Sequence, residues 1–211
     1  WIMLQKETQH WDTDPAYLEA IHSVMSGSEV VLATSVITMS KTYEKPFEEI
    51  VAAGNGFTIE RRFFKEVKGA PEINLLEVRP GDLLRVGDKL VAEYRIWNQE
   101  NRSFVKLTAP REAGFRPMDQ LSGYYGWWLR PLSVRGSYSV TPQGYRNVKT
   151  DRTEYFFDVY PEEKTTVTET FFVTQEGVFR APVVTIESLY APHYRANGAF
   201  GGNFTFNPMI P

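Results

Sequence analysis

From Ser28 onward, the pattern of apolar residues is almost entirely that of β-strands, and several runs alternate with the two-residue period of a strand with one buried face. After a turn at Gly87-Asp88, for example, Leu90, Ala92 and Tyr94 alternate with more polar neighbours. Other runs of strand length and composition lie at residues 57–64, 83–86, 104–107, 153–160, 165–173 and 178–190. Strands at this density, separated by turn residues and without a helical pattern between them, predict an antiparallel β-sandwich.

The first 26 residues have a different pattern. Asp14-Pro15 is a typical helix start, with Asp as the N-cap and Pro at the first helical position, and Gly27 supplies a stop. Between them, apolar residues recur at helical spacing: Tyr17, Leu18, Ile21, Val24 and Met25. A helix of about three turns cannot cover its own apolar stripe. We therefore expect the end of a helical domain here, so the predicted fold class is mainly β with a short N-terminal helical segment.

The segment from Ala109 to Tyr125 fits neither pattern. It contains too many Gly and Pro residues for a helix and alternates too little for a strand. It nevertheless carries five large apolar side chains, namely Phe115, Met118, Leu121, Tyr124 and Tyr125. We expect a connection with so many anchors to pack onto the domain, and to be functional or the signature of one family.

Composition narrows the class of protein. The 211 residues suffice for one large or two small domains, and 42% apolar with 23% charged residues allow a packed core. A net charge of -3 lacks the basic excess of a nucleic-acid-binding protein. The absence of cysteine excludes disulfides, thiolate metal sites and thiol nucleophiles. No apolar run reaches the roughly 18 residues of a membrane helix.

Candidate catalytic and metal-binding residues are sparse. His10, His22 and His193 lie far apart and have no ligand-pair spacing. The acidic pairs Glu48-Glu49 and Glu162-Glu163 have the pattern of solvated turns, and a glycosidase pair would need two carboxylates at a set separation. No nucleophile elbow or phosphate loop is present. We therefore predict no catalytic residue, no metal site and no cofactor.

Two kinds of motif remain open to interpretation. Residues 79–82 and 86–88 end in Gly-Asp, which forms turns far more often than calcium or adhesion loops, because Asp bonds its own backbone. The pairs Phe156-Phe157 and Phe171-Phe172 favour a core role. Trp127 and Trp128, which lie in an irregular segment, are either loop anchors or exposed aromatics suited to carbohydrate.

Several stretches, in this order, resemble one family. Residues 5–12, with Pro15-Ala16, resemble the last helix of the helical domain of bacterial alpha-macroglobulins, particularly those of the Bacteroidetes type. Residues 77–88 are similar to the opening of their C-terminal macroglobulin-like domain. The family's Arg-Ala-(Gly/Ser)-Phe run, ending in Leu-Ser-Gly-Tyr, resembles residues 111–125. Its closing strands are similar to residues 155–158, 177–179 and 189–192.

The resemblance implies a layout of three parts. Residues 1–26 would end the helical domain, called the thioester domain in members that have one. Residues 27–55 would be the returning strands of a CUB-like domain. Residues 56–211 would form the C-terminal macroglobulin-like β-sandwich, the counterpart of the receptor-binding domain of animal members.

The resemblance also implies a function. These proteins trap proteases: cleavage of a bait region releases a conformational change, and a thioester can then attach to the attacker. This chain would be a non-catalytic C-terminal portion of such an endopeptidase inhibitor, with the bait region and any thioester upstream. Its partners would be the helical domain of the parent chain and, through the full-length protein, target proteases. The implied location is the cell envelope (periplasm or cell surface), with membrane contact only through an upstream lipid anchor, as in a lipoprotein.

In some bacterial members a tyrosine of the C-terminal domain covers the thioester. Tyr190, in Leu-Tyr-Ala-Pro, is the candidate counterpart, although a tyrosine packed at a strand end would have the same pattern. Two rival hypotheses remain. A surface adhesion or carbohydrate-binding β-sandwich predicts solvent-facing aromatics, Trp127 and Trp128 among them, beside polar groups. A β-sandwich hydrolase predicts converging carboxylates in a pocket.

Overall fold

The computed structural model describes residues 45–67, 74–79, 81–126, 140–161 and 164–208. The predicted N-terminal helix, Trp127, Trp128 and Glu162-Glu163 lie outside these residues. From Pro46 onward the described residues belong to one compact unit. Helical structure in the described ranges is confined to the 3-10 turn η2 (Phe47–Glu49), and no helix there is long and apolar enough to cross a membrane.

The described strands form three sheets. The seven-stranded sheet has the order β1 (Ala53–Asn55), β14 (Arg195–Asn197), β13 (Thr185–Ser188), β6 (Arg102–Pro110), β10 (Arg152–Val159), β9 (Gly144–Val148) and β8 (Gly123–Tyr125). The five-stranded sheet has the order β3 (Asn74–Val78), β2 (Phe57–Val67), β5 (Lys89–Asn98), β11 (Thr165–Val173) and β7 (Phe115–Pro117). The three-stranded sheet has the order β12 (Gly177–Arg180), β15 (Asn203–Asn207) and β4 (Leu83–Arg85).

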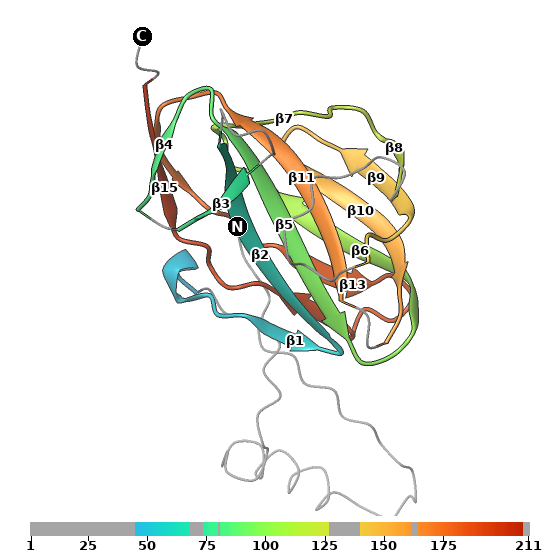
Figure 1. Cartoon of the computed structure of the whole chain (residues 1–211). Helices are drawn as coiled ribbons and strands as arrows, with labels where there is room; N and C mark the ends of the chain where they lie inside the picture. Colours follow the sequence, from blue (N-terminus) through green and yellow to red (C-terminus); the bar gives the residue numbers. More distant parts are fainter. Residues whose placement is uncertain (1–44, 68–73, 80, 127–139, 162–163, 209–211) are drawn as a thin grey trace, which may run out of the picture. The chain divides into compact units, whose positions relative to one another are not determined.

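Two of these sheets form the layers of the predicted sandwich. Figure 1 shows β2, β5 and β11 in one layer and β6, β10 and β13 in the layer behind it. Neighbouring strands within both sheets are antiparallel, whereas β15 and β4 run parallel. The prediction of a mainly β chain with antiparallel sheets is confirmed. The N-terminal helical segment that was also predicted lies outside the described residues.

The core follows from the two-residue period of the strands. Leu90, Ala92, Tyr94 and Ile96 of β5 are buried, as their alternation predicts. Their polar neighbour Glu93 is buried as well, and the Arg95 side chain donates a hydrogen bond to its carboxylate at 2.7 Å. Each Phe pair on β10 and β11 divides between the two faces, with one ring in the core and the other partly exposed.

The predicted strand over residues 178–190 is interrupted. Its first part is β12 in the three-stranded sheet and its second part is β13 in the seven-stranded sheet. Pro182 lies between them, and a residue without a backbone N–H cannot continue a strand ladder. The chain therefore changes sheets at this point.

The two Gly-Asp motifs form turns, as predicted. The carboxylate of Asp82 accepts a hydrogen bond from the Arg79 N–H at 2.7 Å, and that of Asp88 accepts one from the Arg85 N–H at 2.8 Å. Both side chains thus replace a backbone acceptor within their own turn.

The segment from Ala109 to Tyr125 closes one side of the sandwich by visiting both layers. It leaves β6, adds β7 to the edge of the five-stranded sheet and then adds β8 to the edge of the seven-stranded sheet. Phe115 and Tyr125 are buried anchors, as expected. The same expectation is wrong for Met118, Leu121 and Tyr124, whose side chains face solvent.

Candidate functional site

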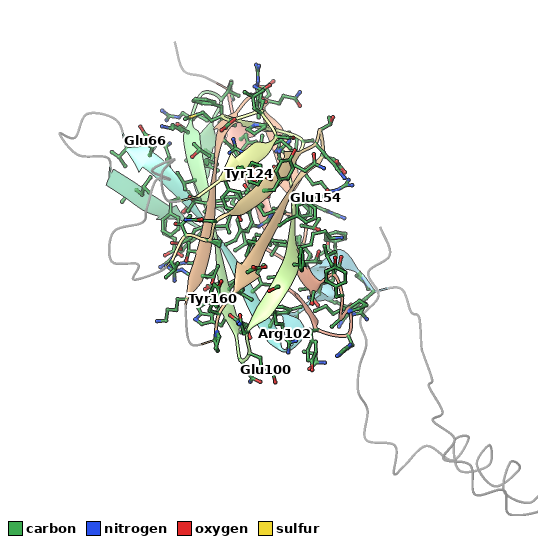
Figure 2. All side chains as sticks on the ribbon, turned by 90° about the vertical axis from the view of Figure 1, so that its right-hand side faces the viewer. Glu66, Glu100, Arg102, Tyr124, Glu154 and Tyr160 are labelled. Carbon is green, nitrogen blue, oxygen red and sulfur yellow. The ribbon has the colours of Figure 1, made fainter. Side chains whose placement is uncertain are left out.

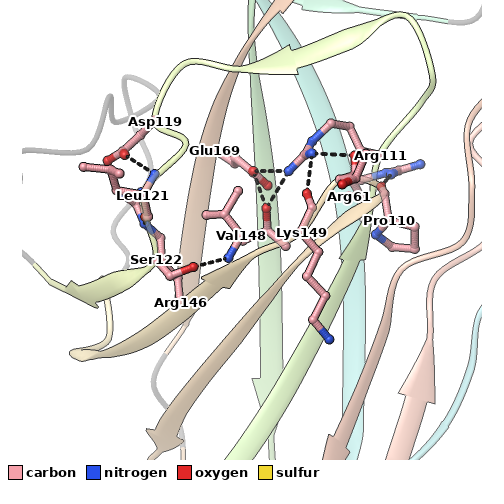
Figure 3. Close-up of polar contacts among 12 residues, drawn as sticks. Arg61, Pro110, Arg111, Asp119, Leu121, Ser122, Arg146, Val148, Lys149 and Glu169 are labelled. Carbon is pink, nitrogen blue, oxygen red and sulfur yellow. Dashed lines mark hydrogen bonds and ion pairs between the residues drawn. The ribbon is translucent and has the colours of Figure 1, made fainter.

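A network of buried charged side chains connects the two layers (Figure 3). Arg111, just after β6, donates hydrogen bonds to the carbonyl oxygens of Lys149 at 2.9 Å and Thr150 at 3.0 Å, and to the Thr153 hydroxyl at 2.8 Å. Thr153 on β10 in turn donates to Glu169 on β11 at 2.6 Å. Arg111 and Glu169 are 3.4 Å apart. Because β10 and β11 belong to different sheets, these contacts join one layer to the other.

A second buried ion pair lies beside the first. Arg61 on β2 and Glu112 approach to 3.5 Å, with only 5% and 1% of their side chains exposed. Arg61 also donates to the carbonyl oxygens of Pro110 at 3.3 Å and Pro182 at 2.5 Å. It therefore fixes the start of the segment from Ala109 to Tyr125, which we call the crossing segment, and the point where the chain changes sheets.

The electrostatics of both carboxylates reflect this burial. Burial raises the pKa of Glu112 above its ordinary value, and the positive charge of Arg61 only partly opposes the shift. Burial also raises the pKa of Glu169, against the hydrogen bond from Thr153 and the charge of Arg111. Charge removed from water is costly unless it is paired, which explains why each carboxylate faces an arginine.

This arrangement does not favour the hydrolase hypothesis. Glu112 and Glu169 are almost completely buried and engaged with arginines, so a substrate could not reach them. Glu48 is exposed in the η2 turn, and His193 is exposed with its ring against Tyr194. Among the residues that the structure describes, no group of His, Asp and Glu side chains could hold a metal ion.

In contrast to this buried network, one cluster of apolar side chains is exposed to solvent. Phe104, Leu189 and Tyr190, which we call the aromatic tip, are 57%, 42% and 79% exposed. The Phe104 and Tyr190 rings meet edge to face, with centroids 5.0 Å apart. The Leu189 N–H donates to the Phe104 carbonyl oxygen at 3.0 Å, so backbone contacts hold the two segments together.

Phe104 has an unusual backbone. Its φ is +56°, and it is the one non-glycine residue with a positive φ among those described. Such a conformation costs a bulky residue about 1–3 kcal/mol. The carboxylate of Asp158 on β10 accepts a hydrogen bond from the Phe104 N–H at 2.9 Å and stabilises the conformation. The result is a phenyl ring held in solvent beside Tyr190.

Comparison with known proteins now identifies the family. Residues 56–193, well over half of the chain, match the family model described as "Bacterial Alpha-2-macroglobulin MG10 domain". The chain belongs to the bacterial alpha-2-macroglobulin family. The Bacteroidetes type is not tested by this match and stays a prediction.

Solved bacterial alpha-2-macroglobulins have the same fold. The Salmonella protein reacted with methylamine is 17% identical with a TM-score of 0.57, over 79% of this chain and 10% of that one. The Escherichia coli protein from domain MG7 to the C-terminus is 16% identical with a TM-score of 0.58, over 78% and 25%. The E. coli protein activated by porcine elastase is 18% identical with a TM-score of 0.58, over 80% and 14%.

The shares covered also give the length of this chain relative to the solved proteins. It spans a tenth to a quarter of the length of these alpha-2-macroglobulins. A search of curated proteins finds no match.

Two features of this alpha-2-macroglobulin domain were missed from the sequence. Arg111 and Glu112 are adjacent charges in a loop, and nothing in one sequence indicates that both point inward. Phe104 follows Ser103 in an ordinary strand pattern, and no residue type there signals a positive φ. Tyr190 was singled out from the sequence, and the structure places it in the aromatic tip, whereas its role in covering a thioester stays a prediction.

Proposed function

We propose that this chain is a non-catalytic C-terminal part of an alpha-2-macroglobulin-like endopeptidase inhibitor, and that it docks against the helical domain of its parent chain. The observation that carries the proposal is the aromatic tip. Phe104 keeps a strained backbone and an exposed ring, and Tyr190 is still more exposed. Exposed aromatic rings supported by a rigid backbone are typical of residues that dominate protein interfaces.

Phe104 lies where the register of β6 shifts against β10 opposite Asp158, as in a β-bulge, and bulges often redirect a side chain next to a functional site. A ring that served only stability would be expected in the core, in a relaxed conformation. Asp158 instead stabilises the strained one, and edge-to-face contact with Tyr190 fixes the orientation of both rings. Strained residues that the surrounding structure holds in place often lie at sites of function.

In the proposed mechanism, the sandwich is a rigid support that the helical domain leaves after bait cleavage. The E. coli relative is described as activated by porcine elastase, which fits a family whose members respond to proteases. If the parent chain has a thioester, Tyr190 would help to cover it. The parent protein would act in the cell envelope, as a lipoprotein in the periplasm or at the cell surface.

The test uses the full-length parent protein with Tyr190→Ala, Phe104→Ala or both. Loss of the aromatic tip should weaken docking, so the uncleaved variants should resemble the protease-cleaved protein in small-angle scattering and native-gel mobility. Val178→Ala is the matched control, because Val178 on the three-stranded sheet is 68% exposed, between the values of Phe104 and Tyr190. Variants that stay as compact as the wild type before cleavage, and change as much after it, would contradict the proposal.

A further inference from the structure

The chain contains two Asn-Gly pairs, Asn55-Gly56 and Asn197-Gly198. Asparagine followed by glycine is especially prone to deamidation, because no Cβ on the second residue shields the backbone nitrogen that attacks the side-chain amide. The two asparagines lie on neighbouring strands, since Asn197 on β14 pairs with Ala53 on β1, two residues before Asn55. The same chemistry therefore stands in two different surroundings.

Asn197-Gly198 is held by several hydrogen bonds. The Asn197 side-chain amide donates to the carbonyl oxygens of Val51 at 2.8 Å and Gly198 at 2.9 Å. Gly198 is buried, and its N–H, whose nitrogen would have to attack, donates to the Val184 carbonyl oxygen at 2.9 Å. The strand β14 also lies between β1 and β13. Deamidation there requires the sheet to open locally first.

Asn55-Gly56 forms the turn between β1 and β2. Asn55 is exposed, and its side-chain amide donates to the His193 carbonyl oxygen at 3.1 Å. Gly56 lies outside both strands with a φ of +75°, which glycine adopts without strain. Its N–H donates no hydrogen bond to another described residue. The attacking nitrogen and the amide that it attacks are therefore available without any opening of the sheet.

A positive charge lies beside this turn. The Arg102 guanidinium is 3.5 Å from the point where a Cβ on Gly56 would lie, and Figure 2 shows Arg102 near Glu100 at one end of the sandwich. Glu100 pairs with Arg102 at 2.9 Å, while the buried Arg102 Nε has no partner among the described residues. Such a charge stabilises the negative charge that develops as the Gly56 nitrogen attacks.

We propose that Asn55-Gly56 is a site of spontaneous intramolecular deamidation, and that the fold directs this reaction to Asn55 and away from Asn197. The Gly56 nitrogen loses its proton to hydroxide and forms a bond with Asn55 Cγ. The Cγ–Nδ2 bond then breaks, and the side-chain nitrogen takes a proton from water and leaves as ammonia. Water next adds to the succinimide: cleavage of its Cγ–N bond gives aspartate, and cleavage at the backbone carbonyl carbon gives isoaspartate.

Deamidation at this turn should loosen β1. Either product loses the amide group that donates to the His193 carbonyl oxygen, and gains a negative charge. Isoaspartate also adds one atom to the backbone between β1 and β2, which disturbs the register of β1 with β14. Because β1 is a strand of three residues at the edge of its sheet, it can open while the rest of the sandwich stays folded. The inference does not depend on the proposed function.

Incubation of the 211-residue chain at mildly alkaline pH, followed by trypsin digestion and mass spectrometry, tests the proposal. Trypsin cleaves after Arg61 and Arg195, so Asn55 and Asn197 fall on different peptides. In the native protein, Asn55 should deamidate within about threefold of its rate in urea, whereas the fold should slow Asn197 by at least about tenfold. In urea, the two asparagines should react at similar rates.

Three variants make the test specific. Asn55→Gln keeps an amide but would have to close a larger ring, so its peptide should stay unmodified. Arg102→Met should slow deamidation at Asn55 by about fivefold, whereas Arg102→Lys, which keeps the charge, should not. If Arg102 served only to hold the fold, both substitutions would loosen the turn and speed the reaction instead.

Hydrogen exchange measures the effect on β1. Ion-exchange chromatography separates the deamidated protein, which carries one more negative charge, from the unmodified protein. The amides of Ala53–Asn55 should exchange faster in the deamidated protein, while those of β10 should exchange equally in both. Asn55→Gln incubated in the same way is the control and should keep the slow exchange of β1.

Several results would overturn the inference. Native Asn55 protected as strongly as Asn197 would show that the turn does not expose the reacting groups. Equal deamidation of both asparagines in the native protein would show that the fold does not direct the reaction. Unchanged exchange of β1 in the deamidated protein would refute the loosening. Faster reaction in both Arg102 variants would refute the role of its charge.

Discussion

Replacing Glu169 with leucine should destabilise the protein far more than a typical surface substitution. Glu169→Leu removes the ion pair with Arg111 at 3.4 Å and the acceptor of the Thr153 hydrogen bond at 2.6 Å. The Arg111 guanidinium, with only 4% of its side chain exposed, would keep its charge without a counter-ion. Breaking a buried ion pair in this way costs about 3–5 kcal/mol.

The same reasoning predicts that removing both charges together restores much of the lost stability. The triple variant Arg111→Met, Thr153→Val and Glu169→Leu removes both charges and the hydroxyl between them. The Tyr155 hydroxyl loses its bond to Glu169, and the Lys149 and Thr150 carbonyl oxygens lose the bonds from Arg111. Replacing a buried ionic group with apolar residues of similar volume is often neutral, or stabilising by about 1–4 kcal/mol. We therefore expect the triple variant to recover much of the stability that Glu169→Leu loses.

Urea denaturation followed by tryptophan fluorescence measures both effects. With a slope of about 2 kcal/mol/M, a loss of about 4 kcal/mol lowers the midpoint by about 2 M. The control is Glu77→Leu, which breaks the ion pair with Arg62 at 2.5 Å, where the side chains are 36% and 24% exposed. An exposed pair should contribute only about 0.2–1 kcal/mol. The reasoning is refuted if Glu169→Leu costs no more than Glu77→Leu, or if the triple variant is less stable than Glu169→Leu.

Three further predictions concern single residues. Burial raises the pKa of Glu112 above its ordinary 4.5, so the unfolded state loses this proton at a lower pH than the folded state does. The stability of the fold should therefore fall as the pH rises from 4.5 through the raised pKa. Urea midpoints measured across that range should fall less in Glu112→Gln than in the wild type. Glycine adopts a positive φ without strain, so Phe104→Gly should be about 1 kcal/mol more stable to urea than Phe104→Ala, and equal midpoints would argue against strain. A Cβ on Gly144 would overlap the Phe156 carbonyl oxygen, so Gly144→Ala should lower the free energy of unfolding by about 1–3 kcal/mol and with it the thermal midpoint. Gly123→Ala, whose Cβ meets nothing within 4 Å, should leave the thermal midpoint unchanged.

The strands were largely predictable because their signal is local. The run over residues 165–173 coincides with β11, and the run beginning at Phe57 became β2. A pleated strand that buries one face must alternate, and this alternation is visible in a single sequence. The predicted strand over residues 178–190 could have been divided from the sequence alone, because Pro182 cannot continue a strand ladder and no long-range contact is needed to see this.

The sheet order and the buried charges could not be predicted in the same way. β6 pairs with β13, about eighty residues away in the chain, and no local pattern specifies such a partner. Likewise, Arg111 lies in a loop and has the pattern of a solvated residue. Glu169 shares the inward parity of Val167 and Phe171 on β11, but one sequence does not show that Arg111 meets it across the sandwich. The exposed positions of Met118, Leu121 and Tyr124 depend on contacts with β9, which one sequence does not show.

The crossing segment has a mechanical consequence. Five residues, 118–122, separate β7 at the rim of one layer from β8 at the rim of the other. A force that lifts β8 away from β9 is transmitted through this short tether to β7, and so to β11 in the opposite layer. A force applied to residues 118–122 therefore acts on both layers of the sandwich at once. Neither edge strand, β7 or β8, can detach without transmitting force to the other.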